Sequence, residues 1–184
     1  MDNGEVPDAF IAEHGFSALV AVAKGDHEYR LLYDAGTSPD GVVENMRRLD
    51  IDPSSIEANV QPWPFRPHHR HRRADPDTRP DQHAVLIHPH LWRRRRVALP
   101  GREPLEIPTT SRRALEQAGF DVIEEQQPSF LFQRSVLVTG EIPRTTRYEP
   151  GLPPQQAWLH DNWQPDPLVL DDQALILNVR DKRF

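Results

Sequence analysis

The sequence predicts a mixed α/β fold, and three observations carry the prediction. An apolar run at residues 16–23 is followed by Lys-Gly-Asp and a second strand at 29–33, which is typical of a β-hairpin. The chain then alternates helix and strand, with the next strand beginning near Ala58. Short apolar runs separated by turn residues continue to residue 179. At 184 residues the chain is long enough for one domain with its own core.

Capping signals place the helices. Ser38 is a good N-cap with proline directly after it, and Val42, Met46 and Leu49 then fall on one helical face. A second cap signal at residues 52–55 predicts a short helical turn. Ser111 predicts the start of another helix, which Gly119 ends.

The second half of the chain predicts short strands. We expect strands at 85–87 and 121–124 and a hairpin formed by 129–132 and 135–139. Residues 140–167, which contain two tryptophans, are expected to be irregular. Residues 168–170 and 174–179 predict another hairpin across two aspartates.

Composition limits the class of protein. The formal charge of −6 does not favour nucleic acid, although arginines cluster at 66–73 and 93–96. Without cysteine, disulfides and cysteine-based zinc sites are excluded. No apolar run approaches the roughly 20 residues that cross a bilayer, and the polar start lacks a signal peptide's apolar core. We expect a cytoplasmic protein that does not contact membranes.

Residues 61–84 break the pattern. They contain five prolines, five arginines and four histidines, with only Trp63 and Phe65 as large apolar groups. Such a segment cannot bury enough apolar surface to offset the entropy of ordering it. We therefore expect an irregular, disordered insert at 61–84, which divides the domain into 1–60 and 85–184.

The flanking segments resemble one family. AEHGFSALV at 12–20 and LLYDAG at 31–36 are similar to the start of a metallo-β-lactamase-fold hydrolase, most closely the dihydropterin ribofuranosylaminobenzene phosphate synthase-like branch. The resemblance continues through 43–49 and 51–52, resumes at LIHPH, and extends through VTGEI at 138–142 to DDQAL at 171–175. It implies the N-terminal part of an αββα sandwich, incomplete in this chain.

The same resemblance implies a metal motif that this chain lacks. In the family, the strand near Ala58 ends in Ser-His-Gly-His-x-Asp-His, whose side chains hold one or two zinc ions. The metal generates hydroxide from bound water for attack on a small-molecule substrate. Residues 60–70 read VQPWPFRPHHR instead, and the C-terminal ligands are also missing. We therefore expect no bound zinc and no hydrolase activity in this form.

A one-base shift of the reading frame accounts for the replacement. The codons AGC CAT GGC CAT TTC GAC CAC ACC ACC GGC encode Ser-His-Gly-His-Phe-Asp-His-Thr-Thr-Gly. When they are preceded by C and read one base early, they encode QPWPFRPHHR, which is residues 61–70 in order. The frame returns by about Val85, and the chain's end after residue 184 is interpreted either as a truncation by a further lesion or as the end of the gene.

Few side chains remain as site candidates, and no catalytic residue or metal ligand is assigned. By resemblance, Asp34 supports a metal-binding histidine through a hydrogen bond; otherwise it is a turn residue. His14, His90 and Glu141 are candidate substrate-binding residues, and for His14, beside Glu13, a surface turn is an equal alternative.

A competing hypothesis is a non-catalytic binding protein. Its His/Arg-rich arm would hold metal or polyanions through His68, His69 and His71 or through arginines 70, 72 and 73. A proline-rich arm offers no rigid support for ligands, so adventitious nickel or zinc binding is the expected outcome. Arginines 93–96 either help to hold an anionic substrate or form a solvated basic face.

Overall fold

The structure is a computed structural model, and it describes residues 10–12, 15–36, 38, 40–61, 83–179 and 182–183. Its first part contains β1 (Ala18–Lys24), β2 (His27–Tyr33), α1 (Gly41–Arg48), the 3-10 turn η1 (Pro53–Ser55) and β3 (Ala58–Gln61). The middle part contains β4 (His83–Ile87), η2 (Pro89–Trp92), β5 (Arg95–Val97), β6 (Leu105–Ile107), α2 (Arg112–Gln117) and β7 (Phe120–Glu124). The last part contains β8 (Ser129–Leu131), β9 (Val136–Val138), β10 (Gln155–Leu159), β11 (Asn162–Pro165), β12 (Leu175–Val179) and β13 (Lys182–Arg183).

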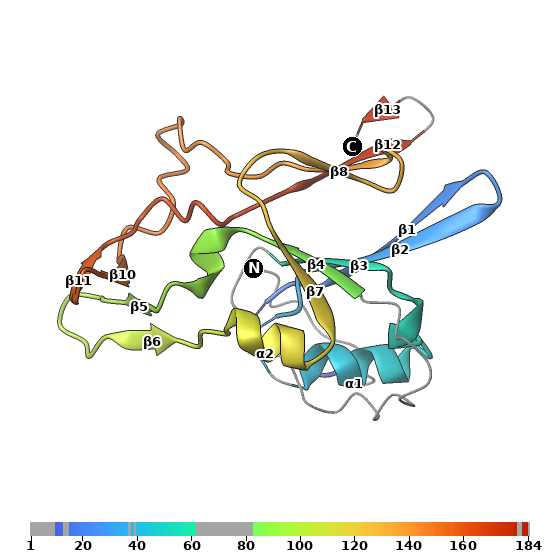
Figure 1. Cartoon of the computed structure of the whole chain (residues 1–184). Helices are drawn as coiled ribbons and strands as arrows, with labels where there is room; N and C mark the ends of the chain where they lie inside the picture. The colour runs from blue at the N-terminus through green and yellow to red at the C-terminus, as the bar shows by residue number, and fades with distance from the viewer. Residues whose placement is uncertain are drawn as a thin grey trace.

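A five-stranded sheet forms the centre, in the order β1-β2-β3-β4-β7. The first pair is the antiparallel hairpin that the sequence predicts, and β2, β3, β4 and β7 run parallel. Both α-helices lie below this sheet and the β13-β12-β9-β8 sheet lies above it (Figure 1). This arrangement confirms the mixed α/β class.

The strands of the central sheet bury alternate residues on its two faces. On β4, Leu86 joins a core cluster with Leu31 and Val60 that packs against Val138 of the upper sheet. The neighbouring Val85 and Ile87 point to the other face, where they pack with Leu115 of α2. Leu91 and Val122 complete this second cluster. Because successive side chains of a strand point to opposite faces, this continuous apolar run is what a sheet covered on both sides requires.

The predicted caps are present, with one shift. Ser111 Oγ accepts a hydrogen bond from the Ala114 backbone N–H at 3.2 Å, and Gly119 has φ +93, which an L side chain rarely adopts. Ser38 Oγ accepts from the Gly41 N–H at 3.0 Å, but the N-cap of α1 is Asp40. That helix therefore begins later than the sequence predicts.

The expectation that residues 140–167 are irregular is wrong. They contain the β10–β11 hairpin, which joins β5 and β6 in a four-stranded sheet, in the order β11-β10-β5-β6. The two-residue turn His160–Asp161 has positive φ at both positions, which suits the twist of a tight hairpin. The sequence does not predict these strands because three glutamines and an asparagine interrupt their apolar residues. Trp158 pairs with Trp163, and the Arg94 guanidinium carbon lies 5.6 and 5.1 Å from the centroids of the two rings.

The hairpin expected from residues 168–170 and 174–179 is also wrong. Residues 168–170 form no strand, and Val169 has φ +49. β12 pairs with β9 on one side and β13 on the other. Asp171, which the sequence suggests is a turn residue, is fully buried and binds Arg95. Residues 168–172 are therefore positioned by this ion pair and not by pairing with a neighbouring strand.

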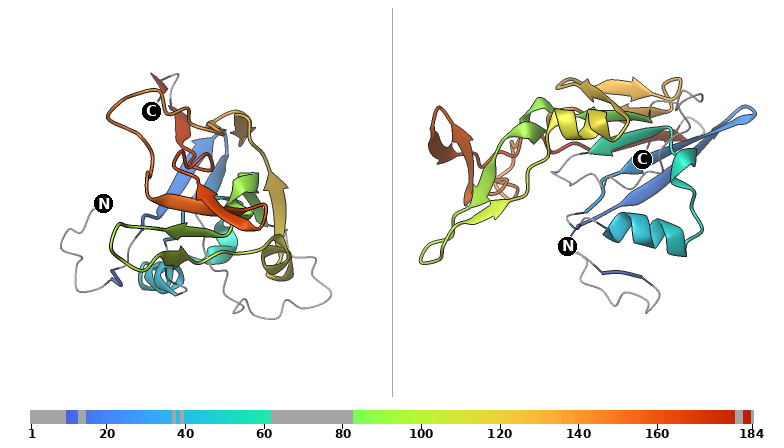
Figure 2. Two further views of the ribbon diagram at one scale, coloured as in Figure 1. Left: turned by 90° about the vertical axis from the view of Figure 1, so that its left-hand side faces the viewer. Right: turned by 60° about the horizontal axis from the view of Figure 1, so that its bottom comes forward.

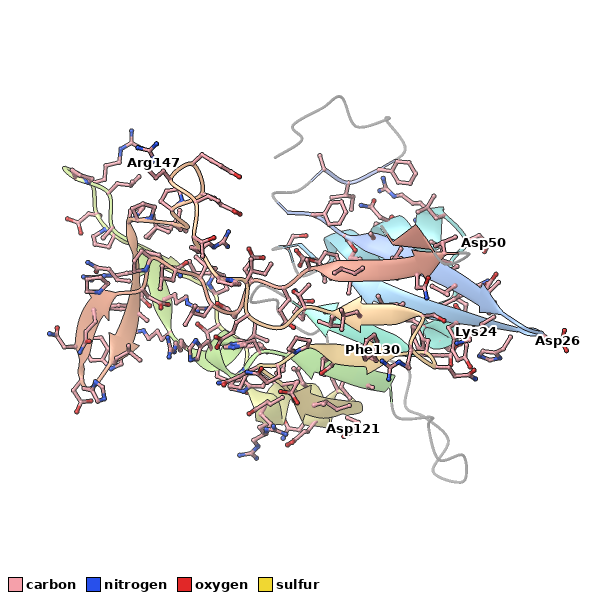
Figure 3. All side chains as sticks on the ribbon, turned by 90° about the horizontal axis from the view of Figure 1, so that it is seen from above. Lys24, Asp26, Asp50, Asp121, Phe130 and Arg147 are labelled. Atoms are coloured by element: carbon pink, nitrogen blue, oxygen red, sulfur yellow. The ribbon has the colours of Figure 1, made fainter. Side chains whose placement is uncertain are left out.

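The predicted insert is bounded by strands. Gln61 ends β3, and residues 83 and 84 begin β4; residues 62–82 lie outside the described residues. Seen from above, the β11-β10-β5-β6 sheet and the loop that carries Arg147 lie at the opposite end of the molecule from the tip of the β1–β2 hairpin at Asp26 (Figure 3). In the described ranges, no helix is long and apolar enough to cross a membrane.

Candidate functional site

The candidate site lies where the parallel strands of the central sheet end. Asp34 follows β2, Gln61 ends β3, and His88 follows β4. In open α/β sheets, ligands bind outside the carboxyl ends of the strands, because the side chains that follow adjacent strands converge there.

Asp34 is held in a left-handed conformation with φ 58, which aspartate tolerates better than most residues. Its Oδ1 accepts hydrogen bonds from the Gln61 amide Nε2 at 2.9 Å and from the Ala35 backbone N–H at 2.7 Å. Its backbone N–H donates to the Val60 carbonyl at 3.0 Å, which fixes the end of β2 beside the end of β3. Oδ1 of this carboxylate thus accepts from two donors within the protein.

Tyr33, the last residue of β2, contacts the segment that returns across this edge. Its hydroxyl donates to the Gln173 carbonyl oxygen. Burial, followed by the nearby carboxylates of Asp172 and Asp34, raises the pKa of the Tyr33 hydroxyl to about 12. Tyr33 is therefore a neutral hydrogen-bond donor at physiological pH.

His88 is the most enclosed ionisable group of this edge, with 0% of its surface exposed. Its Nδ1 accepts the backbone N–H of His90 at 3.1 Å, so the neutral ring carries its hydrogen on Nε2. That Nε2 donates to Glu141 Oε1 at 3.0 Å. Both ring nitrogens are consequently used within the protein.

His90 lies against His88, with the ring centroids 4.6 Å apart, and receives a hydrogen bond from Arg93. The distance from Arg93 Nη2 to His90 Nε2 is 2.6 Å, so Nε2 is the acceptor and Nδ1 carries the hydrogen. Burial, followed by the positive charge of Arg93, lowers the pKa of His90 below its usual 6.5. The Nδ1 atom is buried and has no hydrogen-bond partner among the described residues.

Arg95 is the centre of a buried ionic network. It binds Asp171 through two hydrogen bonds of 2.6 and 2.8 Å, and its Nε donates to Asp166 Oδ2 at 2.9 Å. Asp171 is 0% exposed and Arg95 is 1% exposed. Two parallel N–H···O bonds are the strongest geometry for such a pair.

The other arginines of the 93–96 run also have partners in the fold. Arg93 donates to Asp166 Oδ1 at 3.3 Å as well as to His90. Arg94 forms an ion pair with Glu106, and Arg96 donates to the Gln156 side-chain oxygen at 2.7 Å. The alternative of a solvated basic face is therefore wrong for Arg93 and Arg95, whereas the Arg94 side chain remains about half exposed.

The structure brings some of the predicted residues together. His90 and Glu141 meet at the same residue, His88, which is not among the candidate substrate-binding residues predicted from the sequence. Asp34 is held by Gln61 instead of by a histidine. His14 and the histidines at 68, 69 and 71 lie outside the described residues. The signal that could have found His88 is its position directly after a buried strand, where β4 meets the same edge as β2 and β3.

The described donors at this edge do not fit a metal ion. Within the described part of the chain, no group of three His, Asp or Glu side chains could hold one. The chemistry of the donors gives the reason, since Asp34 Oδ1 is bound to two N–H groups and both nitrogens of His88 are engaged. The edge presents two separate groups of hydrogen bonds, one between Asp34 and Gln61 and one in which His88 binds the His90 backbone and Glu141.

The fold and this edge define a mixed α/β protein with a polar, internally bonded strand-end site. No family model and no curated protein sequence matches the chain. A crystal structure of a Thermotoga maritima protein described as a "putative metallo-beta-lactamase" is similar to it, with a TM-score of 0.39 and 15% sequence identity. The similarity covers 97% of this chain and 69% of that chain.

Proposed function

We propose that this chain is a metallo-β-lactamase-fold protein that does not hydrolyse substrates in its present form. The sequence resemblance at 12–20, 31–36 and 86–90 supports the family, and in the structure the start of β1 and the ends of β2 and β4 lie at one edge of the sheet. In intact relatives the strand-end aspartate supports a metal-binding histidine. Here its Oδ1 holds Gln61, and this bond is the observation that carries the proposal.

The same proposal explains Gln61. Under the frame shift, Gln61 stands where the motif Ser-His-Gly-His-x-Asp-His begins. A glutamine amide can donate to Asp34, as an imidazole N–H would, but it gives no nitrogen ligand for zinc. The hydrogen bond therefore satisfies the aspartate and leaves the zinc chemistry without its first ligands.

A hydrolysis assay tests the proposal. The purified chain, supplied with zinc, is incubated with a phosphodiester and with a lactone, and the rate is compared with zinc alone. We expect no zinc-dependent acceleration above the control, even if zinc binds adventitiously to the histidines at 68, 69 and 71. Saturable turnover that a chelator abolishes would contradict the proposal.

A further inference from the structure

A cluster of charged side chains joins the β11-β10-β5-β6 sheet, called the four-stranded sheet below, to the rest of the molecule. We call it the junction cluster and define it as His90, Arg93, Arg95, Asp166 and Asp171. Among the segments that connect this sheet to the rest of the molecule, η2, which leads to β5, and the segment between β11 and β12 lie side by side (Figures 1 and 2). The junction cluster binds these two segments to each other.

We propose that His90 is an acid-sensitive latch in this cluster, whose protonation releases Arg93 and loosens the four-stranded sheet. The proposal rests on the Arg93–His90 hydrogen bond of 2.6 Å. Arginine can only donate hydrogen bonds, so the bond requires an unprotonated Nε2. Protonation would put two N–H groups, both positively charged, face to face at that distance.

The surroundings of His90 offer the added proton little compensation. Arg93 and Arg95 lie on the side of β5, and His88 lies at the start of η2. Asp171 is the acidic group among the neighbours that act on His90, and both of its oxygens already accept from Arg95. Nδ1, which carries the hydrogen of the neutral ring, is buried and has no hydrogen-bond partner in the part of the chain that the structure describes. The Arg93 side chain is therefore the group that yields, because its other hydrogen bond to a described residue is the 3.3 Å bond to Asp166.

The direction of the pH dependence follows from the lowered pKa of His90. Well above pH 6.5 the imidazole is neutral in both folded and unfolded chains, and its contribution to stability is fully present. Below that value the unfolded chain binds the proton first, so stability falls as the pH drops toward the folded pKa. This device is independent of zinc and of the proposed loss of hydrolysis.

The test follows the tryptophans of the four-stranded sheet in the full chain. Trp158 and Trp163 lie against Arg94, and Arg96 lies 4.3 Å from the Trp163 ring, so their indole N–H resonances report the position of β5. We expect both resonances to titrate between pH 7.5 and 5 with the midpoint of the His90 ring proton, below 6.5. His90→Gln keeps an acceptor for Arg93 and should abolish the change.

The matched control is His160→Gln, because His160 lies on the β10–β11 turn of the same sheet. This variant should titrate as the native chain does. The proposal is overturned if His160→Gln removes the change, or if His90→Gln keeps it. Should His90→Gln fail to fold, the native chain still decides: tryptophan signals that do not move with the His90 midpoint overturn the latch.

Discussion

Replacing Arg95 by methionine should lower the free energy of unfolding by about 3–5 kcal/mol. The substitution removes the cation from between two buried carboxylates, Asp166 and Asp171, and leaves their charges uncompensated. Urea unfolding followed by far-UV circular dichroism measures the change as a lower transition midpoint at a constant slope.

The neighbouring arginine provides the matched control. Arg94 pairs with Glu106 at the surface, where both side chains are 52% exposed, so Arg94→Met should cost about 1 kcal/mol or less. Adding Asp171→Asn to Arg95→Met should recover part of the loss, because one buried charge is removed. Equal costs for Arg94→Met and Arg95→Met would show that the buried network does not hold the sheets together.

Restoring the metal motif should produce the second large effect. We propose to replace residues 61–70 by Ser-His-Gly-His-Phe-Asp-His-Thr-Thr-Gly, which is the sequence that the other reading frame encodes. The replacement supplies imidazole and carboxylate ligands at the end of β3 and frees Asp34 from Gln61. It should add a zinc site at this edge, measured by calorimetry against a competing chelator.

Asp34→Asn separates this site from adventitious binding. In the restored chain it should weaken zinc binding by about 10- to 100-fold, because residues that orient metal ligands affect affinity by that factor. In the native chain the same substitution should leave zinc binding unchanged. If the restored chain binds no more zinc than the native chain, the strand end is not a latent metal site.

The predictable parts of the fold are those fixed by neighbours in sequence. The β1–β2 hairpin has its turn residues between its strands, and Ser111 caps a helix that begins at the next residue. The sequence does not predict the β10–β11 hairpin, because its strands are stabilised by contacts with Arg94 and Arg96, about 60 residues earlier in the chain. Propensity and periodicity carry no information about such contacts.

The sequence indicates some residues of the candidate site but not the contacts between them. Resemblance and position after a strand indicated Asp34, His90 and Glu141. The sequence alone does not distinguish a fully buried histidine from its partly exposed neighbour two residues later, and that difference determines the roles of His88 and His90. Asp171 was interpreted as a turn residue because its partner, Arg95, lies 76 positions away.

The nucleotide sequence of the gene across codons 58–86 tests the central claim most directly. We propose that the end of β3 corresponds to a zinc motif that is replaced here by its frame-shifted counterpart. Read in the alternative frame, codons 61–67 should encode Ser-His-Gly-His, any residue, then Asp-His, with the frames rejoining near Val85. A different sequence in that frame, or a stop codon within it, would contradict the account.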